Sequence, residues 1–260
     1  MQAITRDWGI MHVDHRAGSG VPLVFVNSLG TDLRMWDAVI AALPEDRACL
    51  RMDKRGHGLS ETAPQGYGIP DLAEDVLAAM TGTGIDRAII VGCSIGGLIA
   101  QHVALMAPER VAGLVLSNTA SMLGAAEGWH TRIQAVRENG MAAMAEGIMP
   151  RWFGPKMLAD RTAPLWRTLL ARTDQEGYIA TCAAIAGTDI TERLGEITQS
   201  ALVLGGKHDL ATPPDMVEAL ARVLPRADLV MFEDTGHLPA IEAPEAFTRA
   251  LMTFVERIGA

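Results

Sequence analysis

One serine limits the possible folds of this chain more than any other residue. Ser94 stands in the sequence G-C-S-I-G-G at 92–97, directly after the apolar run 88–91 and directly before the helical pattern of 98–106. A serine on a tight strand-to-helix turn requires small residues two positions before and after it, because the strand and the helix then pass close together. The turn lifts the hydroxyl clear of the sheet, beside a helix N-terminus that favours negative charge. The spacing therefore predicts a nucleophilic serine.

Composition narrows the class of protein. The 260 residues are 49% hydrophobic, which is enough for one sizeable α/β domain with an insertion. No apolar run approaches the ~18 residues of a membrane span. No basic segment followed by an apolar stretch opens the chain, so we expect no signal peptide, no membrane contact and a cytoplasmic location. A net charge of −9 argues against nucleic-acid binding. It still allows an anionic small substrate, because a local arginine outweighs a diffuse field at short range.

The sequence predicts neither a metal site nor a cofactor. Three cysteines, at 49, 93 and 182, are widely spaced and suggest neither a disulfide framework nor a zinc site. The chain contains no G-x-x-x-x-G-K-[ST] and no H-E-x-x-H, and its Gly-Thr-Gly at 82–84 follows a predicted helix rather than a strand. We expect Cys93 to be a small buried residue beside the serine, and not a second nucleophile.

Apolar runs and helical patterns alternate along most of the chain. The runs are short and continuous, as expected of strands buried on both faces of a sheet. They lie at 22–26, 49–53, 88–91, 111–116, 201–205 and 228–232. Helices are predicted at 70–81, 98–106, 214–223 and 244–258. This alternation predicts a doubly wound, mostly parallel sheet, which binds ligands at the carboxyl ends of its strands.

The alternation stops between the runs that end at 116 and begin at 201. The stretch 119–200 reads as helical throughout, with its three prolines as breaks, and it holds three of the five tryptophans. The breaks are expected at Pro150, Pro155 and Pro164. We interpret this stretch as a helical cap inserted between the predicted strands 111–116 and 201–205, on a core formed by 1–118 and 201–260. Such a cap would exclude water from the strand ends and shape a pocket.

A nucleophilic serine requires two partners elsewhere in the chain, a base that takes its proton and an acid that orients the base. Of the seven histidines, His237 follows the last predicted strand, on a loop at a carboxyl end. Chains with a serine on such a turn carry these residues in the order Ser, Asp or Glu, His. Asp209 follows the strand before, between the other two. The sequence therefore predicts a triad of Ser94, Asp209 and His237, with Asp215 and Asp234 as alternative acids.

Attack on a carbonyl group also requires donors for the negative charge that develops on its oxygen. The backbone N–H of Ile95 directly follows the nucleophile, and a second backbone N–H is expected from Leu29, in the loop after the strand 22–26. The Ser28 hydroxyl is an additional donor nearby. Leu29 and Ile95 form the predicted oxyanion hole.

Several motifs resemble the α/β-hydrolase superfamily across essentially the whole chain. They are D-K-R-G-H-G-L-S at 53–60, G-C-S-I-G-G at 92–97, G-G-K-H-D at 205–209 and G-H at 236–237. More narrowly, the segments 27–36, 116–120, 149–153 and 173–178 are similar to those of bacterial 3-oxoadipate enol-lactonases. Cys93 and Ile95 depart from the Leu and Met expected around the serine in that family. The resemblance implies an α/β-hydrolase fold with a helical cap.

The narrower resemblance implies an activity. This activity is the hydrolysis of 3-oxoadipate enol-lactone to 3-oxoadipate, through an acyl-enzyme, in the catabolism of aromatic compounds. The substrate carries a carboxylate, which requires a cation or another donor in the pocket. Arg132 is the first candidate, because Trp129 lies three residues earlier on the same helical face, and Arg151 is the second. Trp129 and Trp152 are either walls of the substrate pocket or core residues of the cap.

Other functions fit the same motifs. Another carboxylesterase or lactonase, or a cofactor-free perhydrolase, would use the same triad. A non-catalytic receptor for a small ligand would use the same fold, but it has no need of an intact nucleophile, acid and base, and is therefore disfavoured. The motifs do not indicate an oligomeric state.

Overall fold

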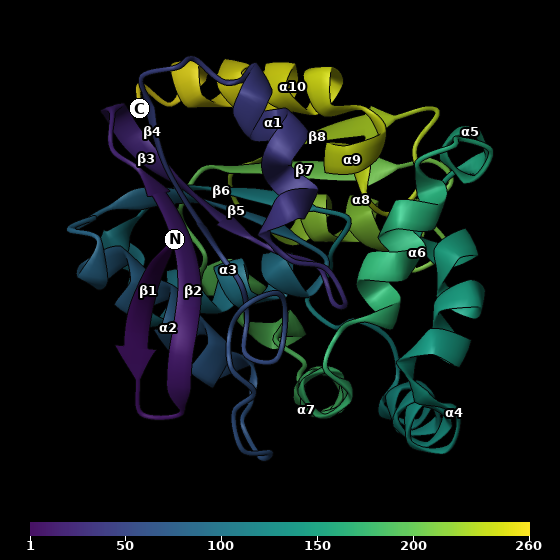
Figure 1. Cartoon of the computed structure of the whole chain (residues 1–260). Helices are drawn as coiled ribbons and strands as arrows, with labels where there is room; N and C mark the ends of the chain where they lie inside the picture. The colour runs from purple at the N-terminus through teal and green to yellow at the C-terminus, as the bar shows by residue number, and fades with distance from the viewer.

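The computed structural model describes all residues from 1 to 260 and contains one eight-stranded sheet, which crosses the centre of Figure 1. The strands are β1 (Gln2–Arg6), β2 (Gly9–Arg16), β3 (Ser19–Val26), β4 (Arg47–Met52), β5 (Ala88–Cys93), β6 (Val111–Ser117), β7 (Ala201–Gly206) and β8 (Ala227–Phe232). Their order across the sheet is β1-β2-β4-β3-β5-β6-β7-β8. All pairs from β4 to β8 are parallel, and β2 pairs antiparallel with β1 and β4. The prediction of a mostly parallel sheet is confirmed.

The hairpin of β1 and β2 extends the sheet beyond the strands that apolar runs predicted. In β2, Met11 and Val13 are buried, whereas Asp14 is exposed. This alternation is typical of a strand with one face against the core. An alternating strand contains no continuous apolar run, so a search for such runs passes over it.

Helices cover both faces of the sheet. In Figure 1, α1 (Asp37–Ala42) and α10 (Pro244–Arg257) lie together above the sheet, and α2 (Ile69–Gly82) and α3 (Ile95–Met106) lie below it. The other helical segments of the core are η1 (Leu33–Trp36), η2 (Pro108–Arg110), α8 (Pro214–Val223) and α9 (Pro239–Glu242). Three helices, α2, α8 and α10, begin and end within one residue of the predicted bounds. No helix in the chain has both the length and the apolar character needed to cross a membrane.

The middle of the sheet is deeply buried. Every residue of β5 and of β7 is buried, because these strands have helices or neighbouring chain on both faces. Trp36 fills the space between β3 and α10, with its ring 5.1 Å from the ring of Phe25 and 5.8 Å from that of Phe247. The packing of Trp36 holds the loop that follows β3, which matters for the site described below.

The segment between β6 and β7 is helical, and it gathers at one end of the sheet, on the right of Figure 1. It contains α4 (Ala126–Trp152), α5 (Pro155–Leu158), α6 (Ala163–Ala171), α7 (Gln175–Ala186) and η3 (Thr191–Glu196). Pro155 and Pro164 lie in the first turns of α5 and α6, where a missing N–H costs nothing. The predicted break at Pro150 is wrong, since α4 continues through it. The helix is interrupted instead at Gly140, with φ of 74°, a conformation that glycine adopts easily.

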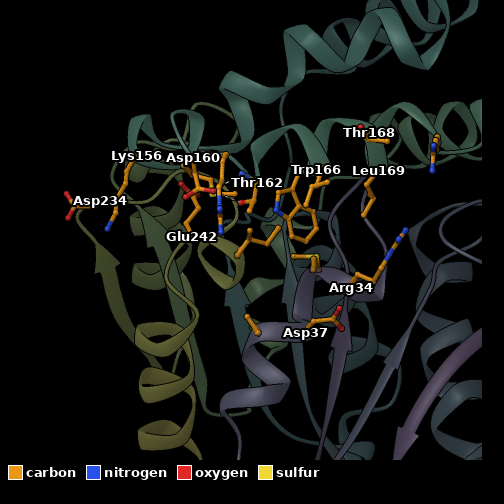
Figure 2. Close-up of a pocket in the computed structure, with 17 residues that line it drawn as sticks. Arg34, Asp37, Lys156, Asp160, Thr162, Trp166, Thr168, Leu169, Asp234 and Glu242 are labelled. Carbon is orange, nitrogen blue, oxygen red and sulfur yellow. Dashed lines mark hydrogen bonds between the residues drawn. The ribbon is translucent and has the colours of Figure 1, made fainter.

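A large cavity lies where this helical segment meets the core, and neither Ser94 nor His237 lines it. It has a volume of about 910 Å³. In Figure 2, Arg34 and Asp37 lie below the cavity, and the residues of α5 and α6, Lys156 among them, lie above it. Four basic and four acidic side chains line it, so it favours neither anions nor cations.

The helical segment packs closely against the core where Gly177 meets Gly56. A Cβ added at Gly177, in α7, would lie 2.4 Å from the Cα of Gly56. We expect Gly177→Ala to push α7 outward and to lower the free energy of unfolding by about 1–3 kcal/mol, measured by urea denaturation. Gly147→Ala is the matched control, because it adds the same methyl group within α4, where no atom lies within 4 Å. That variant should be more stable by about 0.5–1 kcal/mol. Equal effects of the two substitutions would contradict the expectation.

Candidate active site

Ser94 lies on a strained turn between β5 and α3. Its φ of 58° and ψ of −121° belong to a region that residues other than glycine rarely adopt. The Ser94 N–H donates to the carbonyl oxygen of Ser117 at 2.9 Å. A Cβ at Gly92 would lie 2.1 Å from the carbonyl oxygen of Gly96, and a Cβ at Gly96 would lie 2.1 Å from that of Val26. Only glycine fits at these two positions, which explains the spacing around the serine.

Asp209 and His237 meet at the ends of neighbouring strands. Asp209 follows β7, His237 follows β8, and the Nδ1 of His237 lies 2.8 Å from the Oδ2 of Asp209. His237 is buried, and it lines the same cavity as Ser94. The alternative acids, Asp215 and Asp234, are exposed and form no hydrogen bond with the imidazole. The arrangement suits an imidazole base oriented by Asp209, although the catalytic role of the three residues stays a prediction.

Asp209 accepts hydrogen bonds from several groups besides the imidazole. Its Oδ2 accepts from Asn118 Nδ2 at 2.8 Å and from Thr212 Oγ1 at 2.6 Å, and its Oδ1 accepts from the backbone N–H groups of Ala211 and Thr212. Burial by itself would raise the pKa of Asp209, but His237 and these donors hold that pKa below its ordinary value. Asp209 is therefore an anion that can stabilise a protonated His237.

Sequence reasoning missed Asn118 as a partner of the acid. Asn118 directly follows β6 and has a φ of 50°. Asparagine tolerates this left-handed conformation better than most residues do. An asparagine at the carboxyl end of a buried strand was the available signal, and it would have placed an amide donor at the edge where ligands bind.

The loop that carries His237 is hydrogen-bonded to the end of α4. The His237 N–H donates to the carbonyl oxygen of Trp152 at 2.8 Å. One carboxylate oxygen of Glu242 accepts from the Gly154 N–H and the other from the Gly236 N–H, both at 2.8 Å. These bonds couple the position of the histidine loop to the inserted helical segment.

Buried polar groups also fix the loop after β3. Asn27 donates its Nδ2 to the carbonyl oxygen of Met52 at 2.8 Å and accepts from the Trp36 indole at 2.9 Å. Ser28 and Leu29, the next two residues, line the cavity above Ser94. The side chain of Asn27 therefore holds this loop beside the serine.

The two predicted oxyanion donors have no acceptor of their own. The Leu29 N–H makes no hydrogen bond within the protein. Ile95 is the first residue of α3, so its N–H has no acceptor inside the helix. Its side chain is fully buried. Both N–H groups are thus available to a substrate oxygen, and their role stays a prediction.

The cavity above Ser94 has a volume of about 340 Å³, at the lower end of the ~300–1,000 Å³ usual for small-molecule sites. All of the residues predicted to contact substrate line it: Ser28, Trp129, Arg132, Arg151 and Trp152. Trp152 is also buried in the helical segment, so it belongs both to the cavity wall and to the core. Sequence reasoning did not single out Leu123, Ile148 and Tyr178, which also line the cavity.

Two guanidinium groups face this cavity without a carboxylate partner. Neither Arg132 nor Arg151 forms an ion pair within the protein. Arg132 lies over the ring of Trp129, 5.0 Å from its centre. Burial lowers the pKa of Arg151, and the charge of Arg132 lowers that pKa further. Burial raises the pKa of the Tyr178 hydroxyl, so this oxygen stays neutral beside them. The cavity therefore carries two positive charges that form no ion pair with a protein carboxylate.

The residue before the serine is a cysteine, but it is not a reactive one. Cys93 is fully buried, and burial raises the pKa of its thiol. The thiolate is the nucleophilic form of cysteine, and this environment disfavours it. No group of three or more histidine, cysteine, aspartate or glutamate side chains is placed to hold a metal ion.

The sheet, the serine turn and the inserted helices can be compared with known proteins. Residues 23–250 match the alpha/beta hydrolase family. The chain belongs to the α/β-hydrolase family. Its eight-stranded, mostly parallel sheet and the helical segment after β6 form the α/β-hydrolase fold that the sequence motifs predicted.

Similar α/β-hydrolases include lactonases and an esterase. The 3-oxoadipate enol-lactonase 2 of Acinetobacter baylyi is 34% identical over 237 residues, which are 90% of this chain and 88% of that protein. The crystal structure of the enol-lactonase from Burkholderia xenovorans aligns with a TM-score of 0.93 and 35% identity, over 98% of this chain and 100% of that one. A thermophilic esterase from Thermogutta terrifontis aligns with a TM-score of 0.92 and 26% identity, over 100% and 99% of the two chains.

The bond between Asp209 and His237 leads to a test of the triad. Asp209→Asn replaces an anion that accepts from the imidazole with a neutral amide, which favours the wrong tautomer of His237. We expect kcat for p-nitrophenyl acetate to fall about 1,000- to 10,000-fold, with a much smaller change in KM. Asp215→Asn, the same change at an exposed position of α8, should leave kcat unaltered. A nearly active Asp209→Asn variant would remove Asp209 from the triad.

Proposed function

We propose that this α/β-hydrolase opens a small enol-lactone that carries a carboxylate, with 3-oxoadipate enol-lactone as substrate and 3-oxoadipate as product. The observation that carries the proposal is the pair of arginines, Arg132 and Arg151, which face the same cavity as Ser94 and have no anionic partner. A guanidinium group would bind the substrate carboxylate while the lactone carbonyl lies at the serine. The similarity to two enol-lactonases supports this choice of substrate.

Acylation begins when His237 takes the proton of Ser94 and the Ser94 Oγ attacks the lactone carbonyl carbon. The carbonyl oxygen becomes an oxyanion, which accepts from the N–H groups of Leu29 and Ile95. Collapse of this intermediate breaks the ring C–O bond and expels an enolate, a better leaving group than an alkoxide. The enolate stays tethered in the acyl-enzyme. The protonated His237 returns its proton to the enolate, and tautomerisation to a ketone then removes it as a nucleophile and prevents ring closure.

Deacylation reverses the roles of the same groups. His237 takes a proton from water, the resulting hydroxide attacks the acyl carbon, and Ser94 leaves and recovers its proton. The product is a keto acid with two carboxylates. In this proposal residues 119–200 act as a cap on the core of 1–118 and 201–260, and they limit the water that reaches the acyl-enzyme.

The substrate is tested directly by the loss of ultraviolet absorbance of the enol-lactone. We expect the enzyme to hydrolyse this lactone with a higher kcat/KM than p-nitrophenyl acetate, because only the lactone presents a carboxylate to the arginines. Ser94→Ala should abolish both activities, since it removes the proposed nucleophile. Activity on the ester alone would contradict the lactone and indicate a general esterase. Lack of activity on both compounds would contradict the proposal as a whole and favour a non-catalytic receptor for a small ligand.

The proposed carboxylate contact is tested by Arg132→Ala. Loss of a charge-assisted hydrogen bond should raise KM for the enol-lactone about 10- to 100-fold. The variant should leave KM for p-nitrophenyl acetate close to that of the wild type, because this ester has no carboxylate. Arg137→Ala, at an exposed position of α4 outside the cavity, is the control. An unchanged KM for the lactone would refute this role for Arg132 and favour Arg151 as the residue that binds the carboxylate.

A further inference from the structure

One buried cation near the active site has no part in the mechanism described so far. Lys54 lies just after β4 and is 2% exposed. Its Nζ donates to the carbonyl oxygen of Ser28 at 2.8 Å and to that of Asn27 at 3.2 Å. A buried ammonium group is costly, and here its hydrogen-bond partners are neutral carbonyl groups rather than a carboxylate. Its position under the loop after β3 therefore requires an explanation.

The geometry of the peptide group connects Lys54 to the oxyanion hole. In a trans peptide the C=O and the N–H of one unit point in opposite directions. The Ser28 carbonyl and the Leu29 N–H belong to the same unit, so a donor that holds this carbonyl also fixes the direction of that N–H. Lys54 lies on the carbonyl side of the unit. The Leu29 N–H, which has no acceptor in the protein, points the other way.

We propose that Lys54 is a positioning residue for the oxyanion hole, whose ammonium group holds the Ser28–Leu29 peptide with its N–H directed at the substrate oxygen. This inference rests on the proposed serine mechanism, but not on the identity of the lactone. The charge adds a second effect, because a cation at the carbonyl oxygen polarises the peptide and strengthens its N–H as a donor. Lys54 acts through Leu29 and does not touch the substrate.

Thr31 holds the same carbonyl without a charge. Its Oγ1 donates to the Ser28 carbonyl oxygen at 2.9 Å, and its N–H donates to it at 3.3 Å. The carbonyl thus accepts from one charged and two neutral donors. Thr31→Val removes a neutral donor, and Lys54→Met removes the charged one. The two variants together separate the effect of charge from the effect of holding the loop.

The groups around Lys54 determine how its charge responds to pH. Burial lowers the pKa of Lys54 to about 7, against the opposing effect of Asp53 and Asp32. The other ionisable neighbours are neutral, because burial raises the pKa of Cys93 and lowers that of His57. Lys54 therefore loses its charge as the pH rises through about 7. The neutral amine still donates a hydrogen bond, so kcat should fall with rising pH to a lower plateau and not to zero.

The test is the hydrolysis of p-nitrophenyl acetate by Lys54→Met, a neutral side chain of similar length. We expect kcat at pH 6.5 to fall about 10- to 100-fold, less than the ~100- to 1,000-fold that complete loss of an oxyanion donor costs. KM should change little. Inhibition by benzeneboronic acid, whose serine adduct resembles the tetrahedral intermediate, should weaken by a factor similar to the loss in kcat. The decline of kcat with rising pH should disappear in this variant and persist in Thr31→Val.

Several results would overturn the proposal. A kcat of Lys54→Met within twofold of the wild type would do so, and so would a fall in kcat accompanied by an equal weakening of substrate binding and an unchanged pH profile. Lys54→Gln, a neutral donor, is the second variant if Lys54→Met does not fold. If neither variant folds, the pH profiles of the wild type and of Thr31→Val provide the test. A kcat that does not decline with rising pH in these two proteins would contradict a role for the Lys54 charge.

The controls separate this inference from the proposed function. Lys156→Met makes the same chemical change at an exposed lysine of α5 and should leave kcat unaltered. Failure of the enol-lactone as a substrate leaves the ester assay, and hence this test, intact. An ester activity that survives in Ser94→Ala would instead show that the serine mechanism itself is wrong.

Discussion

The crossing of β5, α3 and β3 is the contact on which the active site depends. Gly92 and Gly96 allow backbone atoms to approach where any side chain would collide, and this approach forces Ser94 into its unusual conformation. Such strain costs on the order of 1–3 kcal/mol. The six buried residues of β5 offset it, since each large apolar side chain contributes about 1.5–3 kcal/mol on burial. The same crossing brings the carbonyl oxygen of Val26 against α3, and so places the loop after β3 beside the serine.

Parallel strands explain how residues from distant parts of the chain meet. Six neighbouring strands of the sheet run in one direction, and the residues that follow five of them, β3 and β5 to β8, collect along a single edge. Those residues are Ser28, Ser94, Asn118, Asp209 and His237. The inserted helices add the remaining wall of the cavity and both of its unpaired cations. The core thus holds the groups suited to acyl transfer, the type of reaction by which both lactones and esters are hydrolysed. The inserted segment holds the groups suited to selecting a substrate.

What could be predicted from the sequence followed local signals. Continuous apolar runs marked β3 to β8, and prolines marked the starts of α2, α8 and α10. Chain order alone singled out Asp209 and His237 as a pair. The alternating pattern of β2 was weaker, and Pro150 was a misleading signal because a proline in the last turn of a helix removes only one hydrogen bond. Asn118 had only its place after a buried strand as a signal. The contacts of Thr212 and Lys54 had no local signal, because each depends on which loops the finished sheet brings together.

The buried polar groups are concentrated at the edge of the sheet where the site lies. Most of them follow the carboxyl ends of strands, among them Asn27, Asp53, Lys54, Asn118 and Asp209. An apolar interior of equal volume would be at least as stable, because burying a charge costs more than its hydrogen bonds return unless the geometry is nearly ideal. A chain shaped by stability alone would not concentrate these groups along one edge of its sheet. Their hydrogen bonds instead fix the direction of particular donors and acceptors, which an apolar contact cannot do. The stability given up at this edge is therefore the physical cost of holding the Ser94 site in one geometry.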